Sequence, residues 1–178
     1  MLAARGAWPG AATHPDAFRS VVIINSGIWP DYRWHLFARI WRTPMLGELF
    51  MALVTRRGFQ ASVQYGNRRQ IPAQVVERWY RQYDRGTRHT ILRLYRATNP
   101  STLGYAQVQV LRPLDRPALV IWGKRDPYLP FWLAERQRDA FPRAHVVVLP
   151  NSGHFPFVDD PDTVRGAILP FLRQQLAG

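Results

Sequence analysis

The sequence predicts an α/β protein with three parallel strands, flanking helices and one large helical insertion. Three short apolar runs, at residues 21–24, 118–122 and 145–149, each end at a turn, and helical patterns separate and follow them. Nearly continuous apolar runs rich in valine and isoleucine are typical of parallel strands that are covered on both faces. Strands that alternate with helices favour βαβ units with right-handed crossovers.

The first strand is followed by Asn25-Ser26-Gly27 and then by an insertion of about ninety residues, far longer than an ordinary crossover. Helical spacing predicts four helices in it. The apolar stripe of the first is Trp34, Phe37, Ala38 and Trp41. The second begins after Thr43-Pro44, has the stripe Leu46, Leu49, Phe50 and Leu53, and ends at Gly58. The third begins at Pro72, has the stripe Val76, Trp79, Tyr80 and Tyr83, and ends at Gly86, and the fourth begins at Thr87 with Ile91, Leu92 and Tyr95 facing inward.

Two more helices are expected around the remaining strands. After the second strand, residues 131–140 form a helical pattern that ends at Phe141-Pro142. After the third strand, Asp160-Pro161 begins a final helix, and Pro170 should kink it.

The composition indicates one globular domain. The chain has 178 residues, an apolar fraction of 47% and no cysteine, which excludes disulfides and thiolate metal sites and fits a cytoplasmic protein. No apolar run approaches the roughly 18–20 residues of a membrane span. The first ten residues are too short and too interrupted for a signal peptide.

The net charge of +12 comes almost entirely from arginine, and it is concentrated in one segment. Residues 33–96 hold 13 arginines against Glu48, Glu77 and Asp84, a net charge of +10. Such a surface attracts anionic partners or substrates, but a solvated helical surface is the interpretation we favour.

Two titratable residues follow the second and third strands. Asp126 comes after the turn at Gly123, and His154 follows Gly153, 28 positions after Asp126. An acid and a histidine on neighbouring strand-end loops are the orienter and the base of a nucleophilic hydrolase. Asp126 could instead cap the helix that follows it, and a lone histidine is usually inert. The other histidines are His14, His35, His89 and His145, and no histidine spacing indicates a metal or cofactor site.

These segments, Arg116 to Pro130 and Gly153 to Pro161, resemble the α/β-hydrolase fold family, closest to its lidded branch of epoxide hydrolases, haloalkane dehalogenases and esterases. The resemblance implies a partial hydrolase fold in which Asp126 and His154 follow the family's seventh and eighth strands. It implies a core beginning in residues 1–28, a helical lid in residues 29–112 and the rest of the core in residues 113–178. Asn25 stands where some members carry the acid, and an asparagine cannot replace it.

Five aromatic residues are candidates for contact with a small-molecule substrate. Trp29 and Trp34 could line the pocket, and core packing explains them equally well. The resemblance also suggests Tyr80 and Tyr83, with Tyr95, because epoxide hydrolases bind the epoxide oxygen with lid tyrosines. The same tyrosines fit the helical stripes of a core, which is the interpretation we favour.

The chain departs from the family at its front. No G-x-S-x-G or G-x-D-x-G nucleophile motif occurs, and Gly6 and Pro9-Gly10 interrupt the helix expected after it. We therefore expect the C-terminal portion of a hydrolase of esters, epoxides or similar small apolar compounds, from a truncated or wrongly started reading frame. The alternative is an inactive remnant without turnover, and a nucleic-acid-binding protein ranks last. The first strand should be an apolar sheet edge that favours self-association.

Overall fold

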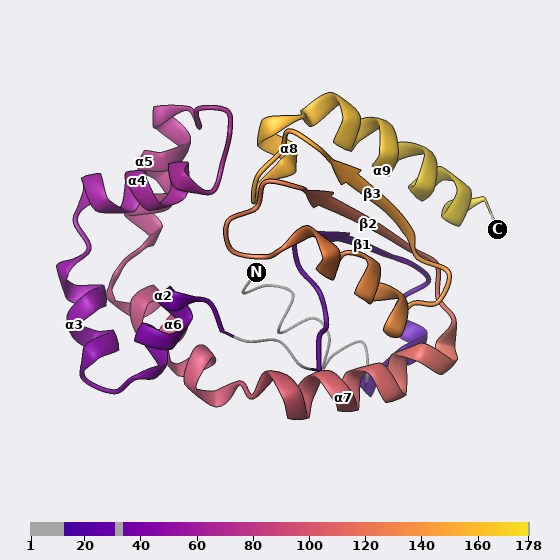
Figure 1. Cartoon of the computed structure of the whole chain (residues 1–178), viewed down its shortest axis with the longest axis horizontal. Helices are drawn as coiled ribbons and strands as arrows, with labels where there is room; N and C mark the ends of the chain where they lie inside the picture. Colours follow the sequence, from indigo (N-terminus) through magenta and orange to yellow (C-terminus); the bar gives the residue numbers. More distant parts are fainter. Residues whose placement is uncertain (1–12, 31–33, 178) are drawn as a thin grey trace.

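The computed structural model describes residues 13–30 and 34–177, and it contains a parallel sheet of three strands. The strands are β1 (Val21–Ile24), β2 (Ala118–Gly123) and β3 (His145–Leu149), in the spatial order β1-β2-β3. Val21 pairs with Ala118, and Leu119 pairs with His145. The predicted α/β class is confirmed, and so is the position of the first strand at an edge of this sheet (Figure 1). Self-association through that edge stays a prediction.

The central strand β2 is buried along its whole length because both faces of the sheet are covered. Val120 and Trp122 pack into one apolar cluster, whereas Leu119 and Ile121 pack into another, as the two-residue period of a strand requires. On the first face lie the short 3-10 helices η3 (Phe131–Leu133) and η4 (Glu135–Asp139), and on the second lies α9 (Pro161–Leu176) (Figure 1). One helix was predicted over residues 131–140, and the structure has these two short 3-10 helices in its place.

The helical insertion, defined here as the residues between β1 and β2, forms its own small core. Its helices are α2 (Leu36–Arg42), α3 (Leu46–Leu53), α4 (Arg56–Tyr65), α5 (Ala73–Gln82), α6 (Arg85–Ala97) and α7 (Pro100–Leu111), followed by η2 (Arg112–Leu114). Helices α2, α3 and α6 meet around Ala38, Met51 and Leu92. Helix α7, which was not predicted, returns the chain to β2 (Figure 1).

Three helix boundaries differ from the sequence prediction, and at two of them another residue supplies the cap. Gly58 does not end a helix but lies in the first turn of α4, where its N–H donates to the Thr55 side chain at 3.1 Å. Helix α6 is capped by Asp84, which accepts from the N–H of Thr87 at 2.7 Å. Helix α3 begins at Leu46 rather than at Pro44.

The apolar stripe predicted for α3 does not face the core. Leu46, Leu49 and Leu53 are 48%, 56% and 68% exposed, and the buried residues of this helix are Gly47 and Met51. Gly47 lies against α2 so closely that a Cβ atom there would be 2.8 Å from the carbonyl oxygen of Trp41. This contact fixes which side of α3 is inward.

Smaller elements complete the chain. They are η1 (Pro15–Ala17) before β1 and the single-turn helix α8 (Pro156–Asp159) after β3. Pro170 lies inside α9 as expected. Residues 1–12, where the sequence predicts that Gly6 and Pro9-Gly10 interrupt a helix, lie outside the described residues. Within the described part of the chain, no helix is long and apolar enough to cross a membrane.

Candidate active site

Asp126 lies just past the carboxyl end of β2, and its side chain is held from several directions. The backbone turns there, with the N–H of Asp126 donating to the carbonyl of Gly123 at 3.2 Å. Its Oδ1 accepts from the N–H groups of Tyr128 and Leu129 at 2.7 and 3.1 Å. The side chain is 0% exposed. A buried carboxylate with these donors has one fixed orientation.

Asn25 connects this carboxylate to the end of β1. Its backbone has a positive φ of 39°, a conformation that asparagine tolerates better than most residues. The side-chain oxygen accepts from the N–H of Gly123 at 2.9 Å, and Nδ2 donates to Oδ2 of Asp126 at 2.5 Å. The sequence analysis excluded Asn25 as the catalytic acid and predicted no other role for it. Its position at the carboxyl end of the strand next to β2 could have indicated that it contacts Asp126.

His154 meets the other side of Oδ2. It follows β3 through the turn at residues 150–153, and its Nδ1 lies 2.7 Å from Oδ2 of Asp126. A carboxylate only accepts, so Nδ1 carries the hydrogen and Nε2 keeps its lone pair. The imidazole is 12% exposed. It can therefore take a proton at Nε2 while Asp126 stabilises the resulting cation.

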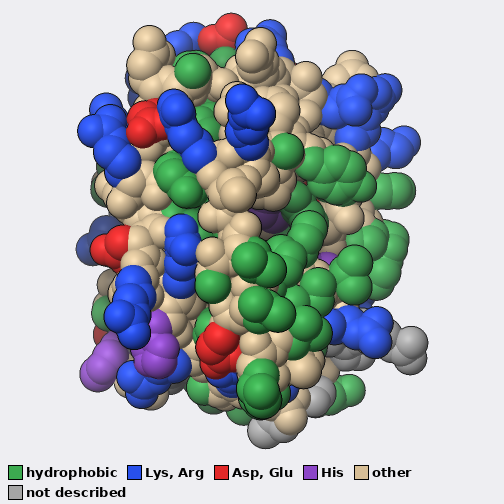
Figure 2. Space-filling model, turned by 90° about the vertical axis from the view of Figure 1, so that its left-hand side faces the viewer, with side chains coloured by type: hydrophobic (Ala, Val, Ile, Leu, Met, Phe, Trp, Pro, Cys, Tyr) green, Lys and Arg blue, Asp and Glu red, His purple; other side chains and the backbone are tan. Residues whose placement is uncertain are grey.

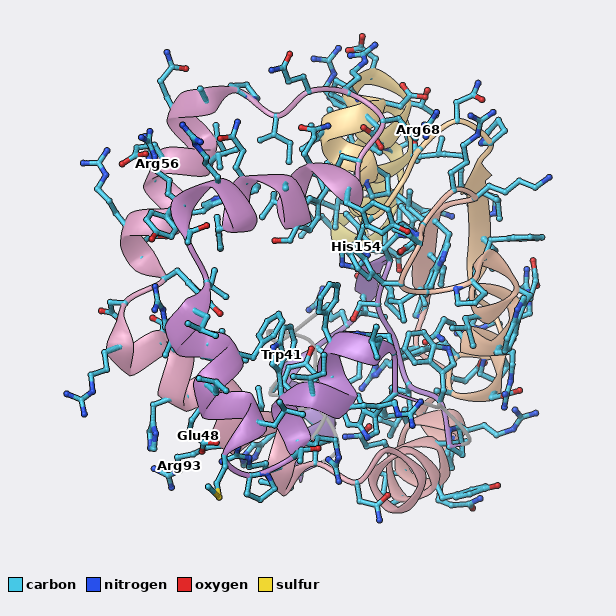
Figure 3. All side chains as sticks on the ribbon, turned by 60° about the vertical axis from the view of Figure 1, so that its left-hand side comes forward. Trp41, Glu48, Arg56, Arg68, Arg93 and His154 are labelled. Atoms are coloured by element: carbon cyan, nitrogen blue, oxygen red, sulfur yellow. The ribbon has the colours of Figure 1, made fainter. Side chains whose placement is uncertain are left out.

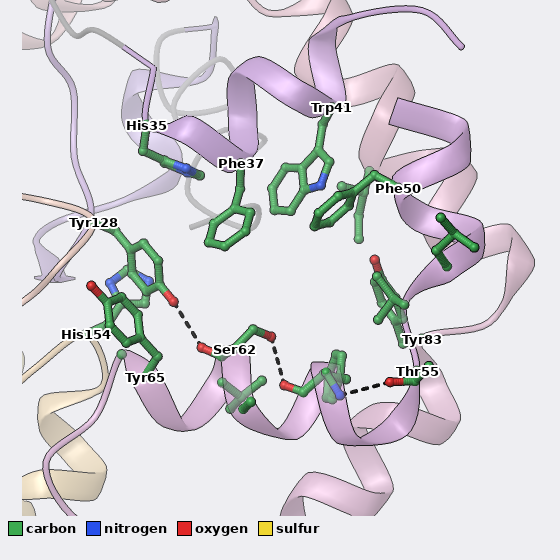
Figure 4. A pocket seen from close by; sticks show the side chains of 18 of the residues that line it. His35, Phe37, Trp41, Phe50, Thr55, Ser62, Tyr65, Tyr83, Tyr128 and His154 are labelled. Carbon is green, nitrogen blue, oxygen red and sulfur yellow. Dashed lines mark hydrogen bonds between the residues drawn. The ribbon is translucent and has the colours of Figure 1, made fainter. Parts of the chain in front are cut away.

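The imidazole opens onto a cavity of about 750 Å³ between the helical insertion and the strand-end loops. His154 and Trp41 face the same central space in Figure 3, and the opening is visible beside a gathering of hydrophobic side chains in Figure 2. His154 and Tyr128 lie at one end, and Phe50 and Tyr83 at the other (Figure 4). The lining is His35, Phe37, Trp41, Phe50, Leu53, Val54, Thr55, Gly58, Phe59, Ala61, Ser62, Val63, Tyr65, Gly66, Tyr83, Ile91, Tyr95, Tyr128, His154 and Phe155.

The polar groups on the cavity wall are mostly engaged with the protein itself. The hydroxyl of Tyr128 donates to the carbonyl of Ser62 at 3.0 Å, and the Ser62 hydroxyl donates to the carbonyl of Phe59 at 2.8 Å. The hydroxyl of Tyr83 donates to the sulfur of Met51. Burial raises the pKa of both Tyr83 and Tyr128, so both hydroxyls stay protonated at neutral pH. No Lys, Arg, Asp or Glu side chain is among the lining residues described.

Of the predicted substrate contacts, the structure brings Tyr83 and Tyr95 to the cavity. Trp29 is 5% exposed, packs edge-on against Trp122 and donates from Nε1 to the carbonyl of Leu133. Trp34 packs on Tyr95 with ring centroids 5.1 Å apart, and Tyr80 packs on Phe59 at 5.5 Å. These three are not in the lining, so the core-packing alternative describes them.

Several lining residues were not predicted, His35 and Tyr128 among them. His35 caps α2 by accepting the N–H of Ala38 on Nδ1 at 3.2 Å, which assigns its hydrogen to Nε2 in the neutral ring. Tyr128 lies between the two histidines, with ring centroids 5.9 Å from His35 and 5.1 Å from His154. Its position directly after Asp126-Pro127 was the signal that could have identified it.

Among the described residues, no group of three or more His, Cys, Asp or Glu side chains could hold a metal ion. The site consists of the Asp126–His154 pair and a wall whose described lining residues include no Lys, Arg, Asp or Glu side chain.

Comparisons with known proteins identify the family of the chain. A family model described as the alpha/beta hydrolase family matches residues 1–167. Haloalkane dehalogenase 2 of Mycobacterium tuberculosis is 28% identical over 186 residues, which cover 89% of this chain and 57% of the relative. The chain thus spans about half the length of the curated relatives it matches.

Two solved structures show the likeness of the fold. Cfl2 of Burkholderia cenocepacia is similar with a TM-score of 0.75 and 18% identity, covering 93% of this chain and 62% of that one. The 2-hydroxy-6-oxo-6-phenylhexa-2,4-dienoate hydrolase of Rhodococcus sp. strain RHA1 has a TM-score of 0.68 and 17% identity, covering 94% and 58%.

Proposed function

The chain belongs to the alpha/beta hydrolase family, and from this we infer that it carries the acid, the base and the substrate cavity of a hydrolase for small, uncharged, apolar compounds. The observation that carries the proposal is the pairing of Asp126 and His154, 2.7 Å apart, at one end of an apolar cavity of about 750 Å³. In this proposal the helical insertion acts as the lid of the site.

Asp126 would hold the His154 ring with Nδ1–H toward itself and stabilise the imidazolium during the reaction. Nε2 of His154 would deprotonate a serine nucleophile, or activate the water that cleaves an ester formed on an aspartate. The sequence contains neither G-x-S-x-G nor G-x-D-x-G, so the nucleophile is assigned to no residue of this chain. Esters, epoxides and haloalkanes all remain within the proposal for that reason.

The wall favours an uncharged substrate, although the chain has a net charge of +12. A carboxylate buried without a cation or several donors loses its hydration uncompensated, which costs far more than burial of an apolar group. The described lining residues include no arginine or lysine. A haloalkane, the substrate that the name of the dehalogenase relative states, is uncharged and suits such a cavity. A dienoate, the substrate in the name of the second structure, is an anion and suits it less well.

Two ligands of equal chain length test this substrate class. We expect 1-chlorohexane to bind the chain and hexanoate not to bind, as followed by the tryptophan fluorescence that Trp41 contributes from the cavity wall. Ala61→Trp, which fills the cavity from α4, should abolish binding, whereas Ala52→Trp on an exposed position of α3 should leave it unchanged. Equal binding of both ligands, or binding that Ala61→Trp does not reduce, would contradict the proposal.

The second candidate is an inactive remnant that retains the fold and the cavity. The coding sequence directly upstream separates the two. An in-frame G-x-S-x-G or G-x-D-x-G there should give a longer protein whose ester, epoxide or haloalkane hydrolysis is abolished by His154→Ala. A stop codon or frameshift there supports the remnant. Turnover by the 178-residue chain itself would contradict the remnant and require an unassigned nucleophile.

A further inference from the structure

A second buried carboxylate, Asp159, lies near His154 and has no part in the proposed chemistry. It is 6% exposed, at the end of α8. Its Oδ1 accepts from the backbone N–H groups of Arg68 and Arg69 at 2.9 and 2.7 Å, and its Oδ2 accepts from the N–H of Gly153 at 2.6 Å. One carboxylate thus connects the residue before His154 with the loop that follows α4.

Two further hydrogen bonds join the same pair of segments. The N–H of His154 donates to the carbonyl of Gly66 at 2.6 Å, and the N–H of Phe155 donates to Oδ1 of Asn67 at 3.1 Å. The two backbones are in direct contact. A Cβ atom on Gly153 would lie only 2.2 Å from the carbonyl oxygen of Gly66. Residues 66–69 and 153–155 therefore form a closed contact, which we call the loop clamp.

The loop clamp joins two parts of the site that are distant in sequence. Helix α4 ends at Tyr65 and supplies cavity wall through Ser62 and Val63. The 153–155 segment carries the imidazole that faces Asp126. Any shift between the segments changes the distance from the wall to the imidazole.

We propose that Asp159 is a positioning residue that fixes the His154 imidazole and the α4 wall of the cavity relative to each other. As a deepening of the proposed function, this rests on His154 being the base. A buried carboxylate is suited to the task because it accepts several N–H bonds, each strengthened by its charge, and donates none. An amide in its place would turn an NH₂ group toward at least one backbone N–H.

A simpler role, capping α9, belongs to the neighbouring residue. Asp160 is the N-cap of α9, and its Oδ1 accepts from the N–H of Thr163 at 3.3 Å. The three partners of Asp159 all lie outside that helix. Its burial is thus explained by the loop clamp and not by the start of α9.

The test is Asp159→Asn in the full chain, read by amide hydrogen exchange and by the His154 Nδ1–H resonance. We expect exchange at Arg68, Arg69 and Gly153 to accelerate about tenfold or more, as the loss of a bond to a charged acceptor implies. We also expect the Nδ1–H signal of His154 to broaden or shift. Asp159→Glu should recover part of the protection.

The matched control is Asp162→Asn, which removes the same charge from the exposed first turn of α9, where Asp162 pairs with Arg165. It should change none of these signals. If Asp159→Asn does not fold, Asn67→Ala replaces it, because it opens the loop clamp at Phe155 and leaves the carboxylate in place. An unaltered His154 Nδ1–H signal in the variant that folds would overturn the proposal.

Failure of the proposed function is distinguishable from failure of this inference. If 1-chlorohexane does not bind while Asp159→Asn alters the His154 signal, the substrate class is wrong and the loop clamp stands. If the ligand binds and the variant leaves the imidazole unchanged, only the positioning role is wrong.

Discussion

The sheet and the helical insertion are stabilised in different ways. Every residue of β2 is buried, and the sheet is held by aliphatic and aromatic side chains on both faces. The insertion buries much less: α4 has no buried residue, and α5 has only Val76. Where apolar burial is small, polar side chains must supply more of the connection between helices.

Arginines supply part of that connection in the insertion, from positions that a charge count treats as surface. Arg42, Arg88 and Arg96 each donate to backbone carbonyls where other helices end, which satisfies acceptors that a helix leaves open and places a cation at its negative end. The acceptors are Tyr95 and Thr98 for Arg42, Tyr83 and Met51 for Arg88, and Trp41 and Thr43 for Arg96. Some of the arginines behind the net charge of +10 in residues 33–96 therefore hold helices together, and these are not free to bind an anionic partner.

The largest effect is expected in the sheet. Trp122 is fully buried, and its Nε1 donates to the carbonyl of Leu129 at 3.1 Å. Trp122→Ala should lower the free energy of unfolding by about 3–5 kcal/mol, because it leaves both a cavity and an unpaired carbonyl. Urea denaturation followed by circular dichroism measures this, with the 54% exposed Trp132→Ala as the control that should change little.

A smaller effect is expected when one arginine of the insertion is removed. Arg88→Met keeps an unbranched apolar side chain but removes both bonds to carbonyls and the cation–π contact with Tyr83, whose ring centroid lies 4.8 Å from the guanidinium carbon. We expect a loss of about 1–3 kcal/mol in the same denaturation experiment. Arg93→Met, at an exposed position of α6 (Figure 3), should cost less than about 0.5 kcal/mol. If Arg88→Met cost more than Trp122→Ala, the contrast between the two regions would be wrong.

The smallest effect concerns Glu48 on α3, which pairs with Arg96 at 2.5 Å. The hydrogen bond from Arg96 lowers the pKa of Glu48 from 4.5 to about 2. A lowered pKa in the folded state contributes stability above the unfolded pKa, and that contribution is lost as the pH falls through the folded pKa. The thermal midpoint of the native chain should therefore exceed that of Glu48→Gln at pH 6, and the difference should shrink as the pH falls from 4.5 to 2. A difference as large at pH 2 as at pH 6 would show that the pair does not titrate in this way.

The sheet could be predicted closely from the sequence, and the cavity could not. The strands at residues 21–24 and 145–149 have the predicted bounds because buried β-branched runs ended by turn residues have few alternatives. The proximity of Asp126 and His154 followed from the same reasoning, since the carboxyl ends of adjacent parallel strands meet at one edge. Their chemical roles stay a proposal.

Helical spacing tells which residues share a side of a helix, but not what that side contacts. Leu46, Leu49 and Leu53 share one side of α3 as predicted, and all three are exposed, with Leu53 at the cavity wall. Phe37 and Phe50 line the cavity because of how α2 and α3 are placed. That placement depends on the close approach at Gly47 and on the arginine bonds. These contacts lie far apart in sequence, and no local pattern reports them.

The contact between Gly123 and Gly153 has a consequence for mutational tolerance. A Cβ atom on Gly123 would lie 2.0 Å from the carbonyl oxygen of Gly153, which belongs to backbone and cannot swing away. In a saturation library we therefore expect both positions to reject every substitution, including alanine. The spacing of the acid and the imidazole is then set by two residues that have no side chain, and a search for functional groups alone would overlook both.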